Sequence, residues 1–160
     1  MNYVVDTNVA IVANGANTNA STECRMATID FLEEMIFKGR LYLDDIGEIE
    51  EEYSRHLNGG APGVGNRFVQ AFFSSAAHRV VRVALAKKKG EFVDFPSAAV
   101  LKRFDRSDRK FAAVARKAGV PVANAVDSDW LEHESALTSN GIAVHFVCGK
   151  DRSAWYRAKT

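Results

Sequence analysis

The chain has 160 residues, of which 47% are hydrophobic and 26% charged, and its formal net charge is +1. This length suits one well-packed domain, and no apolar run approaches the roughly 18 residues that cross a bilayer. The N-terminus also lacks the basic and apolar segments of a secretion signal. These features argue against a membrane or secreted protein and predict a soluble, cytoplasmic one.

The first predicted element is a buried strand that ends in an acid. Tyr3, Val4 and Val5 favour a strand, and they run directly into Asp6 and two small polar residues. Open α/β sheets bind ligands at this carboxyl end of their strands, so Asp6 is a candidate site residue. The alternative that this stretch leaves open is that Asp6 only caps the following segment.

A polar loop over residues 14–22 then leads into a helix and a second strand. Ser21 or Thr22 can cap the helix, whose apolar residues recur at helical spacing, and Gly39 ends it. Cys24 lies in this helix and pairs with no nearby cysteine, since Cys148 is far along the chain. We therefore expect both cysteines to be small buried apolar residues, without a disulfide framework or a zinc site. Residues 41–43 form a short strand.

The next predicted helix, over residues 44–57, carries four glutamates. At about 100° per residue its apolar stripe has Glu50 and Glu52 at its two borders, whereas Glu48 and Glu51 point further outward. Their position on the helix therefore singles out Glu50 and Glu52 among the four glutamates. A merely solvated acidic face is the alternative.

Residues 56–99 are predicted as loops around two short elements. The glycine-rich stretch 56–66 is a loop that fits no phosphate-binding glycine motif, residues 68–73 favour a short buried helix, and residues 80–85 favour a strand or a helical turn. Residues 87–90 form an exposed turn, and residues 91–99 are irregular.

Positive charge is concentrated in the middle of the chain. Residues 78–117 carry 12 Lys+Arg against 4 Asp+Glu, whereas residues 1–77 carry 5 against 11. Such a block suits a phosphate backbone, although charged faces are often only solvated. The candidate nucleic-acid-binding residues are Lys87, Lys88, Lys89, Arg106 and Arg109.

The helix predicted from about residue 104 to Gly119 carries an acid on its apolar side. Asp108 lies one turn before Phe111 and heads the same face, while Arg109, Lys110, Arg116 and Lys117 are expected to turn away. Asp105 or Ser107 is available as the N-cap, so Asp108 is not needed for capping. A buried carboxylate requires a partner, which makes Asp108 a candidate ligand.

A second apolar strand, over residues 120–126, also ends in acids, Asp127 and Asp129. A helix over residues 130–137 and a last strand over residues 142–147 follow. Strands that alternate with helices predict a three-layer α/β/α sandwich with a central, mostly parallel sheet. We expect this domain to span residues 1–149 and to be followed by a polar tail over residues 150–160.

Four acids from distant parts of the chain should thus converge at one edge of the sheet. Asp6 and Asp127 follow strands, and Glu52 and Asp108 come from helices. Carboxylates this close repel one another unless a cation or shared protons intervene. Oxygen ligands without His or Cys favour Mg²⁺ or Mn²⁺ over zinc.

These four motifs, in this order, resemble the PIN domain family of metal-dependent nucleases. VVDTNV is similar to the strand-borne DTN of that family, EEEY to its helical glutamate, FDRSDRKF to its aspartate at a helix start, and NAVDSDW to its last aspartate. The resemblance covers nearly the whole chain. It implies a PIN-like fold with Asp6, Glu52, Asp108 and Asp127 as catalytic residues and metal ligands, and with Glu48, Asp105 and Asp129 as alternative ligands.

The resemblance implies hydrolysis of phosphodiester bonds in single-stranded RNA, with one or two metal ions that activate water. The stretch between the second and third motifs, about fifty residues, is longer than in compact toxin-type members, which bears on the substrate. A toxin, an RNA-processing enzyme and a defence nuclease remain open as roles. Besides nucleic acid, a cognate antitoxin, an operon partner and a second copy of the chain are the partners such a protein can have; a membrane is not.

Two alternatives remain, one in the substrate and one in the class of function. One is a nuclease of the same fold that acts on DNA, and the other is a PIN-like module that binds nucleic acid without cleaving it. The presence of all four acids argues against the non-catalytic module. Aspartate-nucleophile phosphoryl transfer, as in the haloacid dehalogenases, needs a second acid two residues after the first, where this chain has Asn8.

Overall fold

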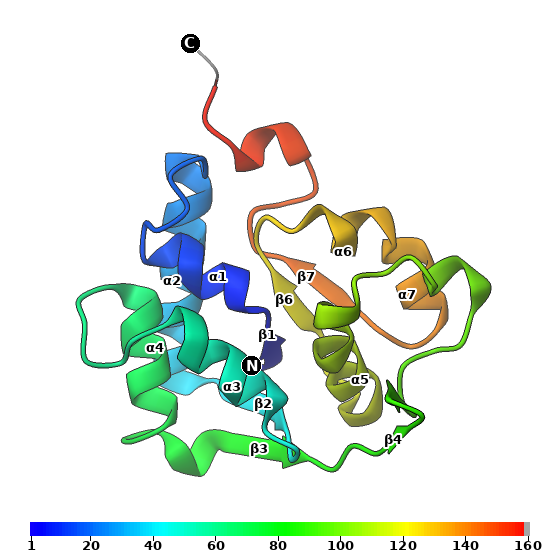
Figure 1. The fold of residues 1–160 in the computed structure, drawn as a ribbon. Coiled ribbons are helices and arrows are strands. Elements are labelled where there is room, and N and C mark those ends of the chain that lie inside the picture. The colour runs from blue at the N-terminus through cyan, green and yellow to red at the C-terminus, as the bar shows by residue number, and fades with distance from the viewer. Residues whose placement is uncertain (159–160) are drawn as a thin grey trace.

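A five-stranded parallel sheet forms the centre of the computed structural model, which describes residues 1–158 (Figure 1). Its strand order is β3-β2-β1-β6-β7, and all neighbouring pairs are parallel. The strands are β1 (Asn2–Val5), β2 (Arg40–Asp44), β3 (Val80–Val83), β6 (Val122–Asn124) and β7 (Val144–Phe146). The α/β class predicted from the alternation of elements is confirmed.

Helices cover both faces of the sheet and give three layers (Figure 1). One layer contains α1 (Thr7–Ala13), α2 (Thr22–Lys38) and α4 (Val64–Phe72), which pack on one another. The other contains α5 (Arg109–Ala118), α6 (Ser128–Glu132) and α7 (Glu134–Ser139). Helix α3 (Glu48–His56) contacts both α1 and α5, so it lies where the two layers meet beyond the strand ends.

The chain reverses its direction across the sheet at β1. From β1 it winds through β2 to β3 on one side, and the crossover through α5 then places β6 on the other side of β1. In open α/β sheets, the crevice outside the carboxyl ends of the strands at such a switch point is the usual ligand site. The fold therefore directs attention to the carboxyl ends of β1 and β6.

Short elements join β3 to α5. Strands β4 (Lys87–Lys88) and β5 (Glu91–Phe92) form an antiparallel hairpin where a turn and irregular chain are predicted. The 3₁₀ turns η2 (Ala99–Leu101) and η3 (Arg106–Asp108) follow the hairpin, whereas η1 (Ala77–Arg79) precedes β3 and η4 (Arg152–Trp155) follows β7. Residues 80–83 are strand rather than helical turn.

Several helix ends follow the expected capping chemistry. The Ser21 hydroxyl accepts a hydrogen bond from the Cys24 N–H at the start of α2, and Gly39 follows its end. Gly119 ends α5 with a φ of +69°, a conformation that favours glycine. Helix α3 begins later than predicted, because the Asp44 carboxylate accepts hydrogen bonds from three successive N–H groups and thereby closes a turn before Glu48.

The glycine-rich loop is shorter than predicted. Gly65 and Asn66 belong to the first turn of α4. A Cβ atom at Gly65 would lie 2.1 Å from the Ala10 carbonyl oxygen, so the missing side chain allows α4 to approach α1.

The single helix predicted over residues 130–137 is two helices in the structure, α6 and α7, which meet at His133.

The expectation that both cysteines are unpaired is wrong, because Cys24 and Cys148 form a disulfide. The two residues are 124 positions apart, and the fold brings α2 and the chain after β7 together. No local pattern in the sequence reports such a pairing.

Residues 150–158 pack against the domain as part of the same body. Trp155 is fully buried, and its carbonyl accepts a hydrogen bond from the Ser21 N–H at 2.8 Å. The Tyr156 hydroxyl donates to the Val126 carbonyl at 3.0 Å, next to Asp127. Within residues 1–158, no helix combines the length and the apolar character needed to cross a membrane.

Candidate functional site

Three of the candidate acids converge at the switch point of the sheet. Asp6 directly follows β1, Asp127 lies three residues beyond β6, and Asp108 ends η3 at the start of α5. One carboxylate oxygen from each residue can be chosen so that all three lie within 4.8 Å of one another. Sequence reasoning placed Asp6 and Asp127 here from the strand ends, and Asp108 from its position on the helix face.

This cluster is shielded from solvent and has spare acceptor capacity. Asp6 and Asp108 are 4% and 7% exposed, and Asp127 is half-buried. The Asp108 Oδ2 atom is buried and has no hydrogen-bond partner among the described residues. Buried carboxylate oxygens normally have a partner, so an orphan oxygen beside two further acids fits a group of hard oxygen ligands for a divalent cation.

Burial raises the pKa values of two of these acids, Asp6 and Asp108. Burial raises the pKa of Asp6 to about 6, where hydrogen bonds from Asn8 and Trp130 oppose the shift and the charge of Asp127 adds to it. Burial also raises the pKa of Asp108 to about 10, and the charge of Asp6 and a side-chain hydrogen bond of the protonated Asp108 with Asp127 add to it, so the Asp108 oxygen is without a partner only in the ionised form. Without a cation, Asp108 therefore keeps its proton at neutral pH.

Two donors fix the Asp6 carboxylate. The Trp130 indole N–H donates to Oδ2 at 2.8 Å, and the Asn8 backbone N–H donates to Oδ1 at 3.1 Å. Asp6 is thus also the N-cap of α1. Capping was the alternative to a site role that the sequence left open, and the one side chain serves in both the cap and the cluster. Asp127 likewise caps α6, since its Oδ1 accepts from the Asp129 N–H at 2.9 Å.

The Asn8 side chain ties α1 to the segment that carries Asp127. Its amide donates to Asn124 Oδ1 at 3.0 Å, and its oxygen accepts from the N–H groups of Ala125 and Val126 at 2.9 and 3.0 Å. Asn124 in turn donates to the Asp127 carbonyl at 3.0 Å. This network fixes the spacing between the ends of β1 and β6, and the sequence analysis did not assign it.

Glu52 lies beside the cluster rather than within its three-carboxylate group. The Thr7 hydroxyl hydrogen-bonds to its Oε2, and Lys110 Nζ lies 2.8 Å from its Oε1. Its charge contributes to the raised pKa of Asp6, so the two carboxylates interact. The hydroxyl of Tyr53, the next residue along, donates to the Val5 carbonyl at 2.6 Å and holds α3 against the end of β1.

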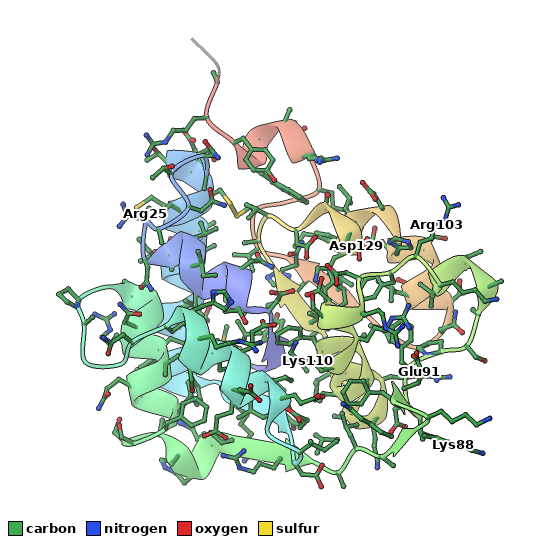
Figure 2. All side chains as sticks on the ribbon, viewed as in Figure 1. Arg25, Lys88, Glu91, Arg103, Lys110 and Asp129 are labelled. Atoms are coloured by element: carbon green, nitrogen blue, oxygen red, sulfur yellow. A yellow bond between two sulfur atoms is a disulfide. The ribbon has the colours of Figure 1, made fainter. Side chains whose placement is uncertain are left out.

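The expectation that Lys110 turns away from the core is wrong. Its side chain is 9% exposed, and the ammonium also hydrogen-bonds to the Ser107 carbonyl. Figure 2 shows Lys110 pointing inward at the centre of the molecule, toward α3. Helix α3 packs against α5 on this side, so the long Lys110 side chain enters the contact between the two helices instead of turning to solvent.

The alternative ligands from the sequence have other contacts. Glu48 pairs with Lys87 at 2.7 Å, although its Oε2 is buried without a partner among the described residues. Asp105 is exposed and caps η3 through Ser107, and its own N–H donates to Asp129 Oδ2 at 2.7 Å. Asp129 also lies 3.2 Å from His133 in a second group with Glu132.

Glu50 and Glu51 remain on the outer side of α3. Glu50 pairs with Arg82 at 3.0 Å, and Glu51 lies 3.7 Å from Arg55. Both pairs are exposed. Glu50, which its position at the border of the apolar stripe favoured, therefore points away from the cluster.

The basic candidates divide into exposed and internally engaged residues. Lys87, Lys88 and Lys89 are exposed on the β4–β5 hairpin, and in Figure 2 Lys88 projects outward from it. Arg106 is exposed and pairs with Glu91 at 2.6 Å. Arg109 is only 13% exposed, pairs with Glu91 and donates to backbone carbonyls, including that of Phe104 at 3.1 Å.

Comparison of the chain with protein-family models, with curated proteins and with solved structures found no match in any of the three. What the site does chemically therefore has to be inferred from its own residues.

Proposed function

We propose that the chain is a PIN-like nuclease that hydrolyses phosphodiester bonds in single-stranded RNA and depends on Mg²⁺ or Mn²⁺. The observation that carries the proposal is the convergence of Asp6, Asp108 and Asp127 within 4.8 Å, together with the orphan Oδ2 of Asp108. The parallel sheet and the switch-point position of the cluster support it.

The donor set fits a hard divalent cation. Asp6, Asp108 and Asp127 would hold it, and Glu52 borders the same space. A bound cation would activate water and neutralise charge that develops on the phosphate. Trp130 and the Asn8 N–H orient Asp6, so this carboxylate is fixed before any ligand arrives.

Exposed lysines on the β4–β5 hairpin support a polyanionic substrate. Lys87, Lys88 and Lys89 lie on the hairpin, and Arg106 lies in η3, two residues before Asp108. These cations can attract a phosphate backbone toward the acidic cluster, which would otherwise repel it. Arg109 contributes to folding instead, because it bonds to backbone carbonyls around Phe104.

Cleavage assays with labelled single-stranded RNA and matched single-stranded DNA test the proposal. We expect RNA cleavage with Mn²⁺ or Mg²⁺ that EDTA abolishes and that Asp108→Asn removes, while Asp105→Asn retains it. Preferential cleavage of DNA would assign the alternative substrate. Binding of RNA without cleavage under any metal would show a non-catalytic module, and cleavage unaffected by EDTA would overturn the metal centre.

The cytoplasmic location belongs to the same proposal, and the Cys24–Cys148 disulfide is an observation against it, because disulfides are rare in that compartment. In a reducing cytoplasm Cys24 and Cys148 are expected as thiols, whereas an oxidising compartment would keep their disulfide. Alkylation of free thiols at the moment of cell lysis distinguishes the two compartments. Alkylated Cys24 and Cys148 would support the cytoplasm, and an intact disulfide would place the protein elsewhere.

A further inference from the structure

A cavity of about 670 Å³ lies between the β4–β5 hairpin and the η2 turn, outside the carboxylate cluster. Its walls are largely apolar and include Phe92, Val93, Pro96, Ala98 and Leu101. The volume is within the range of pockets that bind small organic groups. This cavity can therefore take an uncharged apolar group of moderate size.

The rim of this hairpin cavity is strongly cationic. Five of the described residues that line it are basic, namely Lys88, Lys89, Lys102, Arg106 and Arg109, against one carboxylate, Glu91. Glu91 is already engaged, because Arg106 and Arg109 bind its two oxygens at 2.6 and 3.1 Å. The three lysines are exposed and are left to attract anions. An occupant with an apolar part and attached negative charges matches both features.

The hairpin cavity adjoins a second cavity whose lining includes neighbours of the proposed active-site residues. This second cavity, of about 280 Å³, shares Glu91, Phe92, Arg106 and Arg109 with it and is also lined by Ser107 and Lys110. Ser107 directly precedes Asp108, and Lys110 contacts Glu52. Figure 2 shows the same order, with Lys110 central and Glu91 and Lys88 successively further out. The two cavities together therefore extend from Ser107 and Lys110, beside Asp108 and Glu52, out to the hairpin.

We propose that the hairpin cavity is a subsite for one base of the single-stranded nucleic-acid substrate. The base lies against the apolar walls, and Lys88, Lys89 and Lys102 contact the phosphates on either side of it. This inference rests on the proposed nuclease function, which supplies the polyanion. Apolar walls with a cationic rim are the combination that single-strand binding grooves use for bases and backbone.

Two exposed valines provide a matched pair of variants. Val93 lines the hairpin cavity and is 59% exposed, whereas Val100 is 66% exposed and lies outside the lining. Val93→Asp and Val100→Asp each add one negative charge to this region and remove one exposed apolar side chain. Neither valine belongs to the buried core, so both variants should fold, which circular dichroism verifies.

The test compares two single-stranded RNA probes of about ten nucleotides, a length within known site sizes. One probe carries all its bases, and the other has stable abasic residues, so the backbone charge is the same. Fluorescence anisotropy in EDTA measures both affinities without cleavage. We expect the unmodified protein and Val100→Asp to prefer the base-bearing probe by roughly tenfold or more, and Val93→Asp to lose most of that preference.

Equal affinity of the unmodified protein for both probes would overturn the subsite, and so would equal behaviour of the two aspartate variants. Failure to bind either probe would overturn it as well. A parallel cleavage assay with Mn²⁺ separates this inference from the proposed function. Cleavage without base preference refutes the subsite alone, whereas base preference that depends on Val93, without cleavage, refutes the nuclease and leaves the subsite.

Discussion

Lys110 and Glu52 form an ion pair between α5 and α3, with Nζ 2.8 Å from Oε1 and side-chain exposures of only 9% and 12%. The ammonium neutralises a glutamate whose charge raises the pKa of Asp6. In the metal-free protein the pair therefore relieves part of the repulsion within the acidic site. Toward an incoming divalent cation, the same ammonium is a competing positive charge.

We expect Lys110→Met to destabilise the metal-free protein and to tighten Mn²⁺ binding. Removal of one partner leaves the other charge buried and unpaired, at a cost of about 3 kcal/mol. The freed Glu52 carboxylate would then face the cation site without competition. Denaturant unfolding in EDTA measures the first effect, and calorimetric titration with Mn²⁺ measures the second.

Lys38→Met is the matched control, because Lys38 pairs with Glu34 at 2.9 Å on the surface, with side-chain exposures of 56% and 52%. That change should alter the free energy of unfolding by less than about 1 kcal/mol and leave Mn²⁺ affinity unchanged. Weaker Mn²⁺ binding in Lys110→Met would contradict the competition and show that Lys110 positions the ligands.

The raised pKa of Asp108 predicts that the metal-free protein loses stability as pH rises. In the unfolded chain an Asp ionises near its ordinary pKa of 3.8, whereas folded Asp108 keeps its proton up to about pH 10. Between these values the folded state binds more protons than the unfolded state, so stability falls with increasing pH. Asp6 adds a smaller effect that ends near its pKa of about 6.

Thermal melts in EDTA across this pH range test that expectation. Asp108→Asn should flatten most of the pH dependence and raise the melting temperature at neutral and alkaline pH. Mn²⁺ should restore stability to the unmodified protein more than to the variant, because cation binding opposes the repulsion. Asp105→Asn is the control at an exposed position, and its melts should follow those of the unmodified protein. Parallel curves for Asp108→Asn and the unmodified protein would contradict the raised pKa.

The fold and the three clustered acids follow from local patterns that the sequence displays. Apolar runs that end in acids predict the positions of Asp6 and Asp127, and helical periodicity predicts that Asp108 points inward. Each inference uses residues within one element, where neighbouring side chains have fixed relative directions. The parallel order of the strands then places the ends of different elements at one edge.

Contacts between distant elements were beyond such patterns. The Cys24–Cys148 disulfide and the Asn8–Asn124 hydrogen bond join residues 124 and 116 positions apart. Lys110 was assigned outward because a helical wheel shows one helix and not the neighbour that a long side chain can reach. The DTN motif did contain a signal for Asn8, since an amide three residues after a strand end can bond to an adjacent strand.

Asparagine substitutions should separate the cluster from the caps. Asp105→Asn keeps the oxygen that accepts from the Ser107 N–H at 2.9 Å, so activity and stability should change little. Asp127→Asn likewise keeps the cap on α6 but removes a charge from the cluster, so we expect loss of most activity with little loss of stability. Turnover at saturating Mn²⁺ and melting temperature measure the two properties.

Asp6→Asn should differ from Asp127→Asn in stability. Both Asp6 oxygens accept hydrogen bonds, from Trp130 and from the Asn8 N–H, so an amide would turn its NH₂ group toward one of these donors. One unpaired donor beside the buried side chain costs about 1 to 3 kcal/mol. We therefore expect Asp6→Asn to lose activity and to melt earlier, and an unchanged melting temperature would contradict the two-donor geometry.

Asn8→Ala should weaken Mn²⁺ binding although Asn8 is not proposed as a ligand. Its side chain accepts from two successive N–H groups, at Ala125 and Val126, just before Asp127. Loss of these bonds should cost about 2 kcal/mol and release Asp127 from its position. Calorimetric titration with Mn²⁺ and denaturant unfolding give the two quantities.

Asn14→Ala provides the matched control for that variant. Asn14 forms a similar pair of bonds with Asn66, both at 3.0 Å, at the other end of α1. It should lose comparable stability while its Mn²⁺ affinity stays unchanged. Equal Mn²⁺ affinities of the two alanine variants would show that Asn8 stabilises the fold without positioning Asp127.

The β4–β5 turn predicts opposite effects of one substitution on stability and on binding. Lys88 in β4 lies opposite Glu91 in β5 in the strand register. Lys89 and Gly90 between them form a two-residue turn with φ values of +55° and +79°. Both central residues of a type I′ turn have positive φ, and Asn and Gly suit it. A lysine in this left-handed conformation costs about 1 kcal/mol.

We expect Lys89→Asn to raise the free energy of unfolding by up to about 1 kcal/mol, because Asn tolerates the positive φ of the turn. The same change removes a cation, so it should weaken binding to single-stranded RNA and lower the salt slope by about 1. Lys88→Asn is the control, since Lys88 lies in β4 without a positive φ and should weaken binding with no gain in stability. Anisotropy titrations at several salt concentrations, with denaturant unfolding, measure both properties; an unchanged salt slope in Lys89→Asn would exclude this lysine from the path of the nucleic acid.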